Sequence, residues 1–502
     1  MNKFILLFLA VALPAAIFAQ ETGVCGTMPT EASMQRTLRN RDTYLANPTQ
    51  TRNVVTYVPV KFHLIGKADK TQVISEGRVL DMLCRLNEAY ADQDIQFYIR
   101  NGFNYIYNDA AYSNPGDAPL VLSGNRDNQA VNVYLGLNAN PPSGGGLGTT
   151  LGYYSPQNDW LVVKKSEVSY SASTLPHEVG HFFSLAHPFN GWDCTAWTAA
   201  EFGNPVSITT APCFPVPVEL ADGSNCGSSG DFLCDTPADY NLGFLNGNSC
   251  VYSGNCMDPT GTPLDPMENN WMSYFNGCSD YQFTNQQKGL VAADLDSRLN
   301  LQTNFSPKAT EITGVPQPLS PINGAVTDGY NNINFSWTEV EGANQYFLEI
   351  DQLPNFSLNP KRMTVWGTSK VVTGLNPNLT YYWRVRAFNE YATCTDYSLG
   401  ATFVSGLTTS TDESALVNGW EVMPNPVNSG ATLTLTLEAA QSFEANVQLA
   451  NLSGQVLYQT SRQVPQGATA LELPTANLAP GLYLVSVKTG DAVLTRRVVV
   501  SR

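Results

Sequence analysis

STLPHEVGHFFSLAHPF, residues 173–189, holds three of the four histidines of this 502-residue chain, at His177, His181 and His187. Residues four apart lie on one face of a helix, so the first two imidazoles can reach a single cation. The third histidine can join them only if the helix ends and the chain turns sharply near Ser184. The spacing therefore predicts a short helix followed by a tight turn.

Three neutral imidazoles with one open position suit a tetrahedral zinc ion better than a softer or redox-active metal. Glu178 stands beside the first histidine, where its carboxylate can take a proton from a water molecule on the metal. A single histidine on an apolar helix face is usually a packing residue, but three in this spacing predict a metal site. Glu201, 20 residues after His181, is the alternative to His187 as third ligand, because thermolysin-like enzymes use a glutamate near that spacing.

This segment resembles the metzincin metalloproteases, whose pattern is HExxHxxGxxH followed later by a Met-turn. Downstream, NNWMSYFNGCSDYQFTNQQ places Met272 and Tyr274 where those enzymes have the Met-turn methionine and a tyrosine two residues later. With GDFLCDTPAD and CSDYQFT, the likeness over residues 53–300 is to the pappalysin family in particular. The chain departs from the pattern at Ser184, where the family uses glycine for a positive φ, and a serine there costs about 1 kcal/mol.

The resemblance implies an α/β catalytic domain, a twisted sheet with an active-site helix, that hydrolyses peptide bonds of extracellular proteins. In that family zinc sits on the three histidines, and Glu178 would be the general base. Met272 would form an apolar floor beneath the metal, and Tyr274 would hydrogen-bond the developing oxyanion. An extended protein or peptide substrate is expected to pair with the strand edge in TLGYYSPQNDWLVVKK. The alternative is a secreted adhesin or binding protein with a vestigial metal site.

Cys25, in CGTM, follows the expected export signal and lies outside the cysteine-rich part of the chain. A thiolate is a good zinc ligand, so we expect Cys25 to occupy the water position and to keep the enzyme latent, as in pappalysin-like proteins with such a propeptide. The alternative is a disulfide between Cys25 and Cys84. Activation would then require a cut in the polar segment, near Arg52.

Seven of the ten cysteines crowd into 85 residues, and export allows most of them to form disulfides. Because seven is odd, one of them stays free or pairs with Cys84. By resemblance to the family, the loops around the Met-turn are bridged by two disulfides, Cys250–Cys278 and Cys194–Cys256.

The loop GDFLCDTPAD is rich in acidic and carbonyl oxygens, which suit a hard cation. The same resemblance assigns Asp231 and Thr236 to a structural calcium site. A solvated acidic turn without a bound ion is the alternative interpretation of this loop.

The rest of the chain divides into segments of different composition. The start, MNKFILLFLAVALPAAIFAQ, combines a basic residue, an apolar run and small residues, which predicts a secretory signal peptide over residues 1–19 rather than a membrane anchor. Residues 20–52 form the expected propeptide, and residues 53–305 form the expected catalytic domain. Two all-β sandwiches are expected to follow, over residues 316–405 and 417–502.

The first of these sandwiches resembles the fibronectin type III family through Trp337 and Tyr381, the latter as its tyrosine corner. The second closely resembles the C-terminal sorting domains of the type IX secretion system of Bacteroidetes-type bacteria. That likeness rests on Pro-Asn-Pro at 424–426 and on Gly-Leu-Tyr at 481–483. It implies the type IX machinery as a partner, passage through both membranes, and release or attachment at the cell surface.

Composition sets limits on the partners. Apolar residues make up 43% of the chain and charged residues 14%, which favours a globular extracellular protein over a disordered one. A net charge of -16 leaves no basic patch to displace counterions from phosphates, so nucleic acid is not an expected partner. No later segment is long and apolar enough to predict a transmembrane anchor, and the protein is expected to be a monomer.

Overall fold

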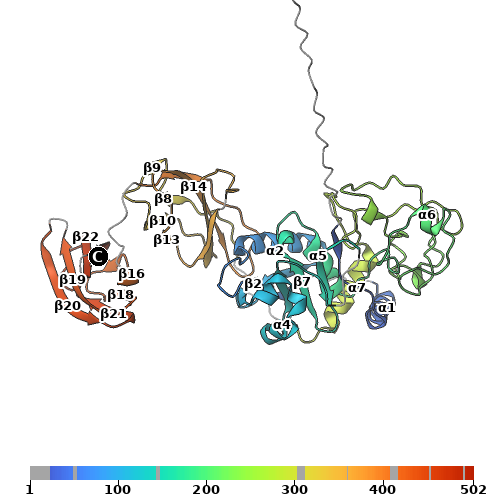
Figure 1. The fold of residues 1–502 in the computed structure, drawn as a ribbon, viewed down its shortest axis with the longest axis horizontal. Coiled ribbons are helices and arrows are strands. Elements are labelled where there is room, and N and C mark those ends of the chain that lie inside the picture. The colour runs from blue at the N-terminus through green and yellow to red at the C-terminus, as the bar shows by residue number, and fades with distance from the viewer. Residues whose placement is uncertain are drawn as a thin grey trace, which may run out of the picture. The chain divides into compact units, whose positions relative to one another are not determined.

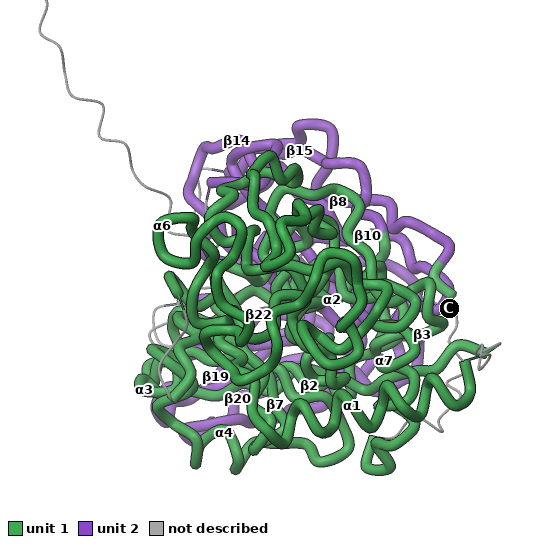
Figure 2. The backbone as a smooth tube through the Cα atoms, turned by 90° about the vertical axis from the view of Figure 1, so that its right-hand side faces the viewer, with its two compact units in different colours: residues 1–312, 388–395 green, residues 313–387, 396–502 purple. Residues whose placement is uncertain are grey.

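The computed structural model describes residues 23–48, 54–142, 147–301, 311–358, 360–406, 416–451, 454–489 and 492–501. The expected signal peptide and the expected cleavage point at Arg52 lie outside these residues. The chain divides into two compact units, which Figure 2 distinguishes by colour. The first consists of Met1–Ile312 and Phe388–Thr395, and the second of Thr313–Ala387 and Asp396–Arg502.

The first unit is built on one mixed sheet (Figure 1). Its strands in the described part of the chain are Gly23–Cys25 (β1), Thr56–Gly66 (β2), Ile95–Ile99 (β3), Asn104–Tyr107 (β4), Val131–Gly136 (β5), Thr149–Ser155 (β6) and Trp160–Lys164 (β7). They follow the order β1-β6-β7-β5-β2-β3, and β4 also pairs with β2. All neighbours are parallel except β6 and β7, which are antiparallel. Without β1, therefore, β6 would be the edge of the sheet.

The helices of the first unit lie beside this sheet or in the segments that follow it (Figure 1). Their bounds are Glu31–Ala46 (α1), Glu76–Tyr90 (α2), Asp109–Ser113 (α3), Pro119–Asn125 (α4), Thr174–Phe182 (α5), Ala199–Phe202 (α6) and Asn285–Ser297 (α7). β5 is buried along its whole length, as expected of a central parallel strand covered on both faces. Every residue of α5 is buried as well. The histidines on α5 therefore lie inside the unit and do not face bulk solvent.

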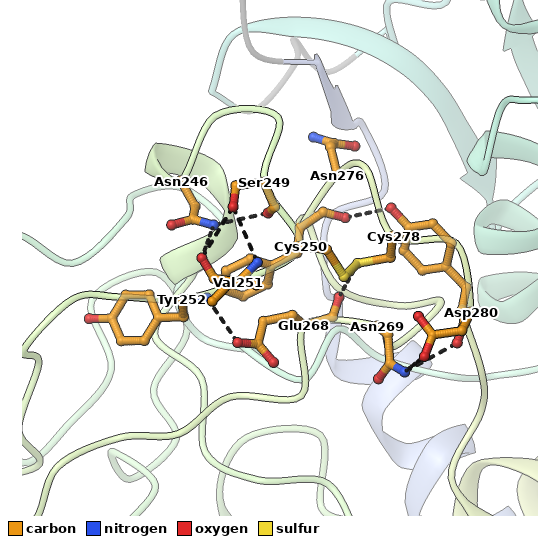
Figure 3. Close-up of a disulfide and its surroundings, with 12 residues drawn as sticks. Asn246, Ser249, Cys250, Val251, Tyr252, Glu268, Asn269, Asn276, Cys278 and Asp280 are labelled. Carbon is orange, nitrogen blue, oxygen red and sulfur yellow. Dashed lines mark hydrogen bonds between the residues drawn. A yellow bond between two sulfur atoms is a disulfide. The ribbon is translucent and has the colours of Figure 1, made fainter.

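Between α5 and α7 the chain has little regular structure, and disulfides hold it together. These bridges join Cys194 to Cys213, Cys226 to Cys234, and Cys250 to Cys278. Figure 3 shows the last of them, beside the contact in which the Glu268 carboxylate accepts a hydrogen bond from the backbone N–H of Tyr252 (2.9 Å). The disulfide between Cys250 and Cys278 that the family resemblance implies is thus present.

The expected disulfide between Cys194 and Cys256 is wrong. The loop after α5 folds back on itself, because the N–H of Cys213 donates to the carbonyl of Gly191 (2.8 Å). This brings the Cα atoms of Cys194 and Cys213 to 5.5 Å, within bridging distance. Cys256 remains a free thiol, buried in an apolar cluster with Phe202 and others. A nearby cysteine in the folded loop has therefore replaced the partner that the family pattern implied.

Cys84 on α2 bonds to Cys394, so the alternative pairing of Cys25 with Cys84 does not occur. The segment Phe388–Thr395, which carries Cys394, belongs to the first unit although its flanking residues belong to the second. Its backbone also bonds to β3, because the N–H of Ile99 donates to the carbonyl of Glu390 (3.0 Å). This short segment is therefore part of the first unit in structure, although it lies between segments of the second unit in sequence.

The second unit begins with two sheets. Their strands are Pro318–Ser320 (β8), Ala325–Val326 (β9), Ile333–Trp337 (β10), Gln345–Asp351 (β11), Lys361–Val365 (β12), Ser369–Val372 (β13), Thr380–Phe388 (β14) and Ala401–Val404 (β15). The sheet orders are β13-β10-β8 and β12-β11-β14-β15-β9. Phe335 on one sheet packs edge-on against Trp383 on the other, with ring centroids 5.2 Å apart. The hydroxyl of Tyr381 accepts a hydrogen bond from the N–H of Asn376 (2.8 Å), the contact expected of a tyrosine corner.

The last part of the chain also forms two sheets, with orders β16-β18-β21 and β17-β23-β22-β19-β20. The strands are Val417–Met423 (β16), Val427–Asn428 (β17), Leu433–Ala439 (β18), Phe443–Asn451 (β19), Val456–Val464 (β20), Gly467–Leu473 (β21), Gly481–Thr489 (β22) and Ala492–Ser501 (β23). Alternate residues of β18 and β22 are buried in one apolar core, as the period of a strand requires. No helix among the described residues has the length and hydropathy to span a bilayer.

Candidate metal centre

The end of α5 decides where the third histidine lies. The N–H of Ser184 donates to the carbonyl of His181 (3.0 Å), and the N–H of Leu185 donates to the carbonyl of Gly180 (3.0 Å). This pair of bonds is a Schellman motif, which ends a helix with one residue in the left-handed region. That residue is Ser184, with φ of 68°. The sharp turn expected at this position is therefore present, and it returns the chain toward the helix face.

The turn brings the three histidines together. The Nε2 atom of His187 lies 3.1 Å from that of His177 and 3.0 Å from that of His181. All three side chains are buried. The alternative third ligand, Glu201, is exposed on α6 and does not belong to this cluster of metal-binding groups among the described residues.

Each imidazole is oriented by an acceptor at its other nitrogen. The Nδ1 atom of His177 bonds to the carbonyl of Trp271 (2.8 Å), and that of His181 bonds to the carbonyl of Leu185 (2.8 Å). The Nδ1 atom of His187 bonds to the Asp193 carboxylate (2.6 Å). Since these oxygens can only accept, each Nδ1 carries the hydrogen and each Nε2 presents a lone pair. Nε2 atoms that carry lone pairs and no hydrogen cannot hydrogen-bond to one another, although those of His177 and His181 lie about 3 Å from that of His187. The arrangement therefore suits a cation that all three nitrogens share.

Burial also keeps the rings of His177 and His181 neutral, which is the form that binds a metal. It lowers the pKa of His177 to about 3, and the charge that His187 could carry adds to the effect. The pKa of His181 is lowered in the same way, first by burial and then by the neighbouring histidines. The site therefore needs no deprotonation of these two rings at neutral pH before a cation enters.

Glu178 follows His177 on α5, and its carboxylate is fully buried. It accepts hydrogen bonds from the Thr27 hydroxyl (3.1 Å) and from the Cys25 thiol (3.4 Å). Burial is the main reason that its pKa is raised, to about 8. A carboxyl group with such a pKa can exchange a proton near neutral pH.

The Cys25 thiol reaches the same centre from β1. Its sulfur and the ligand nitrogens of the three histidines all lie within 4.8 Å of one another. Two contacts fix the main chain of Cys25, because its N–H donates to the Tyr274 hydroxyl (3.1 Å) and its carbonyl accepts from the same hydroxyl (3.1 Å). The thiol is therefore brought to the histidines by the strand that covers the edge of β6.

Helix α1 adds a second attachment of the N-terminal segment. The Arg36 guanidinium donates to both oxygens of Asp294 on α7 and to the carbonyl of Phe182 (2.9 Å). Asn40 donates to Asp294 (2.8 Å) and to the hydroxyl of Ser184 (2.8 Å). Asp294 is fully buried and also binds Arg298 (2.8 Å), so its charge keeps a partner without the helix.

Met272 lies against Gly180 of α5 and is fully buried. A Cβ atom placed on Gly180 would come 2.3 Å from its sulfur, so α5 needs a glycine here for the two segments to meet. The preceding residue, Trp271, supplies the carbonyl that orients His177. The segment expected as a Met-turn is thus placed directly beside the histidine cluster.

Asp231 and Thr236 lie apart from the histidine cluster, in the disulfide-held region. Asp231 is buried, and its Oδ2 atom accepts no hydrogen bond from the described residues. Burial raises its pKa well above the usual range. Glu219 lies close by, and burial followed by the charges of Asp231 and Asp239 raises its pKa to about 9. In the described part of the chain these buried acidic side chains form no ion pair with a basic residue.

Sequence reasoning missed several residues that shape the centre. Asp193 and Thr27 contact its residues, and Arg36 holds the N-terminal segment to Asp294 on α7, through side chains that no local pattern singles out. Of the three, Asp193 has the most recognisable sequence context, because it follows His187 by six residues in a turn-forming stretch, NGWD. The other two come from the N-terminal segment, and only the folded chain brings them here.

Comparison with known proteins adds independent observations. Residues 421–501 match the secretion system C-terminal sorting domain. An extracellular metalloprotease of Colletotrichum graminicola is 30% identical over 207 residues, which cover 37% of this chain and 72% of that protein. An extracellular metalloprotease of Neurospora crassa is 25% identical over 315 residues, which cover 56% of this chain and 92% of that protein. Among solved structures, a promirolysin variant of Tannerella forsythia is 16% identical with a TM-score of 0.35, and the match covers 55% of this chain and 96% of that one.

Proposed function

Because the chain belongs to the extracellular metalloproteases, we propose that it is a zinc endopeptidase of the pappalysin type, made as a latent zymogen. The sorting domain directs it to the type IX secretion machinery, so the protein is exported and acts outside the cell or on its surface. One observation carries the proposal. The buried Nε2 atoms of His177 and His181 both lie within 3.1 Å of the Nε2 atom of His187, and each of the three rings is oriented by a separate acceptor.

In this proposal His177, His181 and His187 hold the zinc ion, and Glu178 is the general base. When bound, zinc supplies a Lewis acid that polarises the scissile carbonyl and activates water. The Glu178 carboxylate takes the proton of the attacking water and later gives it to the leaving amine. Its pKa, raised to about 8 by burial, supports this role, because a group near the working pH can both accept and return a proton.

The Tyr274 hydroxyl is proposed to stabilise the oxyanion. In the described chain the main chain of Cys25 occupies this hydroxyl as both donor and acceptor (3.1 Å each). Once the N-terminal segment leaves, the hydroxyl is available to donate to a substrate oxygen. Met272 supports the histidines from below without being a ligand.

Latency is proposed to rest on the N-terminal segment, residues 20–52. Three features support it: the Cys25 thiol lies at the histidine cluster, β1 pairs with the edge of β6, and Arg36 on α1 binds the buried Asp294. A thiolate in the open coordination position would exclude water. β1 would also exclude an extended protein substrate, because it already uses the backbone groups of β6. Removal of the segment would then free both the metal and the strand edge.

A structural calcium ion at Asp231 and Thr236 is proposed as a second metal site, and we add Glu219 to its ligands. Buried carboxylates without a base are costly unless a cation compensates their charge. The absence of a hydrogen bond to Asp231 Oδ2 within the described residues supports an ion at that position.

The test of the catalytic proposal is zinc-dependent cleavage of denatured casein by protein freed of its N-terminal segment. Chelation should abolish cleavage, and added zinc should restore it. Glu178→Ala should remove cleavage while zinc content and thermal stability stay at the level of the parent. A Glu178→Ala protein that cleaves at the parental rate would refute the mechanism. A parent that never cleaves would favour the alternative, an adhesin with a vestigial metal site.

A further inference from the structure

His187 differs from the other two histidines in the way the chain holds it. His177 and His181 lie on α5, whose backbone fixes their spacing. His187 follows the end of that helix by five residues and lies on a turn. A ligand on a loop needs an anchor of its own, because a loop backbone restrains its side chain less than a helix does.

The anchor is Asp193, six residues further on. One carboxylate oxygen accepts the Nδ1 hydrogen of His187 (2.6 Å), and the other accepts the N–H of Gly191 (2.9 Å). The turn between them is closed by a bond from the N–H of Asn190 to the carbonyl of His187 (2.9 Å). On its other side the His187 ring stacks on Phe189, with centroids 4.6 Å apart. Both oxygens of the aspartate are thus used, and the ring is held in its plane.

We infer that Asp193 is a positioning residue for the metal, acting through His187; this rests on the proposed zinc site. It holds the tautomer that presents Nε2 to the ion, and its negative charge makes that nitrogen a better electron donor. His177 and His181 bond to neutral carbonyls, so Asp193 is the charged member of the three acceptors. The aspartate is itself buried, which strengthens its effect because water does not screen it.

Zinc affinity of the full-length chain tests this inference without relying on catalysis. Asp193→Asn keeps the shape of the side chain but leaves one oxygen to serve two donors, and it removes the charge. We expect zinc to bind about 10- to 100-fold more weakly, measured by competition with a chromophoric chelator. The absorption spectrum of the cobalt-substituted protein should change as well, since it reports the geometry of the ligands.

Asp258→Asn is the matched control. Asp258 is a fully buried aspartate in the same disulfide-held region, and it accepts backbone hydrogen bonds from Ala221, Thr260 and Thr262 without contacting a histidine. A general loss of loop structure would affect both variants. We expect the control to keep the parental zinc affinity and cobalt spectrum.

A double-mutant cycle with His187→Ala separates positioning from a structural role. If Asp193 acts through His187, Asp193→Asn has no further effect on the two-histidine site that His187→Ala leaves. An equal weakening in both backgrounds would overturn the inference, and so would parental affinity in the single variant. If the parent itself binds no zinc, the proposed function fails, and the inference fails with it.

Discussion

Ser184 adopts a backbone conformation that the metzincin sequence pattern, which this segment resembles, reserves for glycine. Its φ of 68° lies in the left-handed region, which costs a residue with a Cβ about 1 kcal/mol. Two hydrogen bonds from α1 offset this strain, since Asn40 donates to its hydroxyl (2.8 Å) and Thr37 donates to its carbonyl (2.7 Å). The residue that ends α5 is therefore also a contact point for the N-terminal segment.

Cys25→Ala should raise the activity of the uncut precursor. The variant removes the thiol that lies among the three metal-binding histidines. If the loss of the thiol weakens binding of the N-terminal segment by even 1.4 kcal/mol, the equilibrium constant for its dissociation from the site rises about tenfold. The measurement is the rate of peptide cleavage by precursor in which the N-terminal segment is verified as intact.

The control for this experiment is Cys256→Ala. Cys25 and Cys256 are the two free cysteines of the described chain, and both are buried. Only Cys25 lies at the histidine cluster, so Cys256→Ala should leave the precursor as inactive as the parent. A Cys25→Ala precursor that stays inactive would remove the cysteine from the account of latency.

Signals that predict a site from sequence are local, and the contacts that complete it are not. The spacing of His177, His181 and His187 reflects one helix and one turn, so one continuous segment of sequence encodes it. Asp193 could not be chosen from its neighbours, because its role depends on the direction of the turn that carries it. The predicted disulfide between Cys194 and Cys256 is wrong for the same reason, because the loop after α5 folds back and brings Cys213 to Cys194.

Helix α1 illustrates the same limit at the level of elements. Its polar sequence gave no periodicity to predict a helix, and the segment was expected only as a propeptide. The structure gives it a capping box at Thr30 and an ion pair between Arg36 and the buried Asp294. The sequence alone does not predict an ion pair between Arg36 and Asp294, because only the folded chain brings these two distant residues together. The strands and helix α5 of the first unit, in contrast, follow the apolar patterns that the sequence carries.

Arg36→Ala should loosen the N-terminal segment without unfolding the catalytic unit. Asp294 keeps Arg298 as its partner, so no buried charge is left alone. The lost bonds to a charged group correspond to about 1.5 to 3 kcal/mol. We expect higher peptidase activity of the uncut precursor and faster proteolysis within residues 23–48.

Arg39→Ala is the matched control for this prediction, because Arg39 carries the same charge on the same helix but is exposed. It should leave activity and proteolysis at the parental level. Equal behaviour of the two variants would mean that the ion pair with Asp294 does not hold the segment.

The acidic loops between α5 and α7 give a pH-dependent prediction. Without a cation, the folded state is more stable when Glu219 is protonated, because folding raises the pKa of this side chain from 4.5 to about 9. Its contribution to stability is complete below about pH 4.5 and is lost as the pH rises toward 9. Bound calcium reverses this loss by compensating the ionised carboxylates, so its stabilising effect should grow with pH.

Thermal unfolding with added calcium or magnesium, at constant zinc, measures that effect. Calcium at a hundred times its dissociation constant contributes about 2.7 kcal/mol, which raises the Tm of a unit of this size by about 5 to 10 °C. We expect this shift at pH 8 and little at pH 5. Asp231→Asn should abolish it, whereas Asp222→Asn, on an exposed turn, should not. Equal Tm values with the two ions at pH 8 would speak against the site.

The whole molecule is tied together by more than its linear order. The disulfide between Cys84 and Cys394 closes a loop of 310 residues, and it fixes the segment Phe388–Thr395 to the catalytic unit. The residues on both sides of this segment belong to the second unit. The disulfide therefore links the second unit to the first covalently, in addition to the main chain that joins Ile312 to Thr313. A cut between residues 301 and 311 should therefore leave them joined.

An engineered protease site inserted between residues 301 and 311 tests this connectivity. After cleavage, the two fragments should migrate as one species on a denaturing gel without reductant and as two with reductant. Cys394→Ala supplies the control, because its fragments should separate under both conditions. Since cross-links that close long loops constrain the unfolded chain strongly, the same variant should lose about 4 to 5 kcal/mol of stability. Fragments of the parent that separate without reductant would show that the bridge does not form, and the β-rich part of the protein would then be released by a single cut.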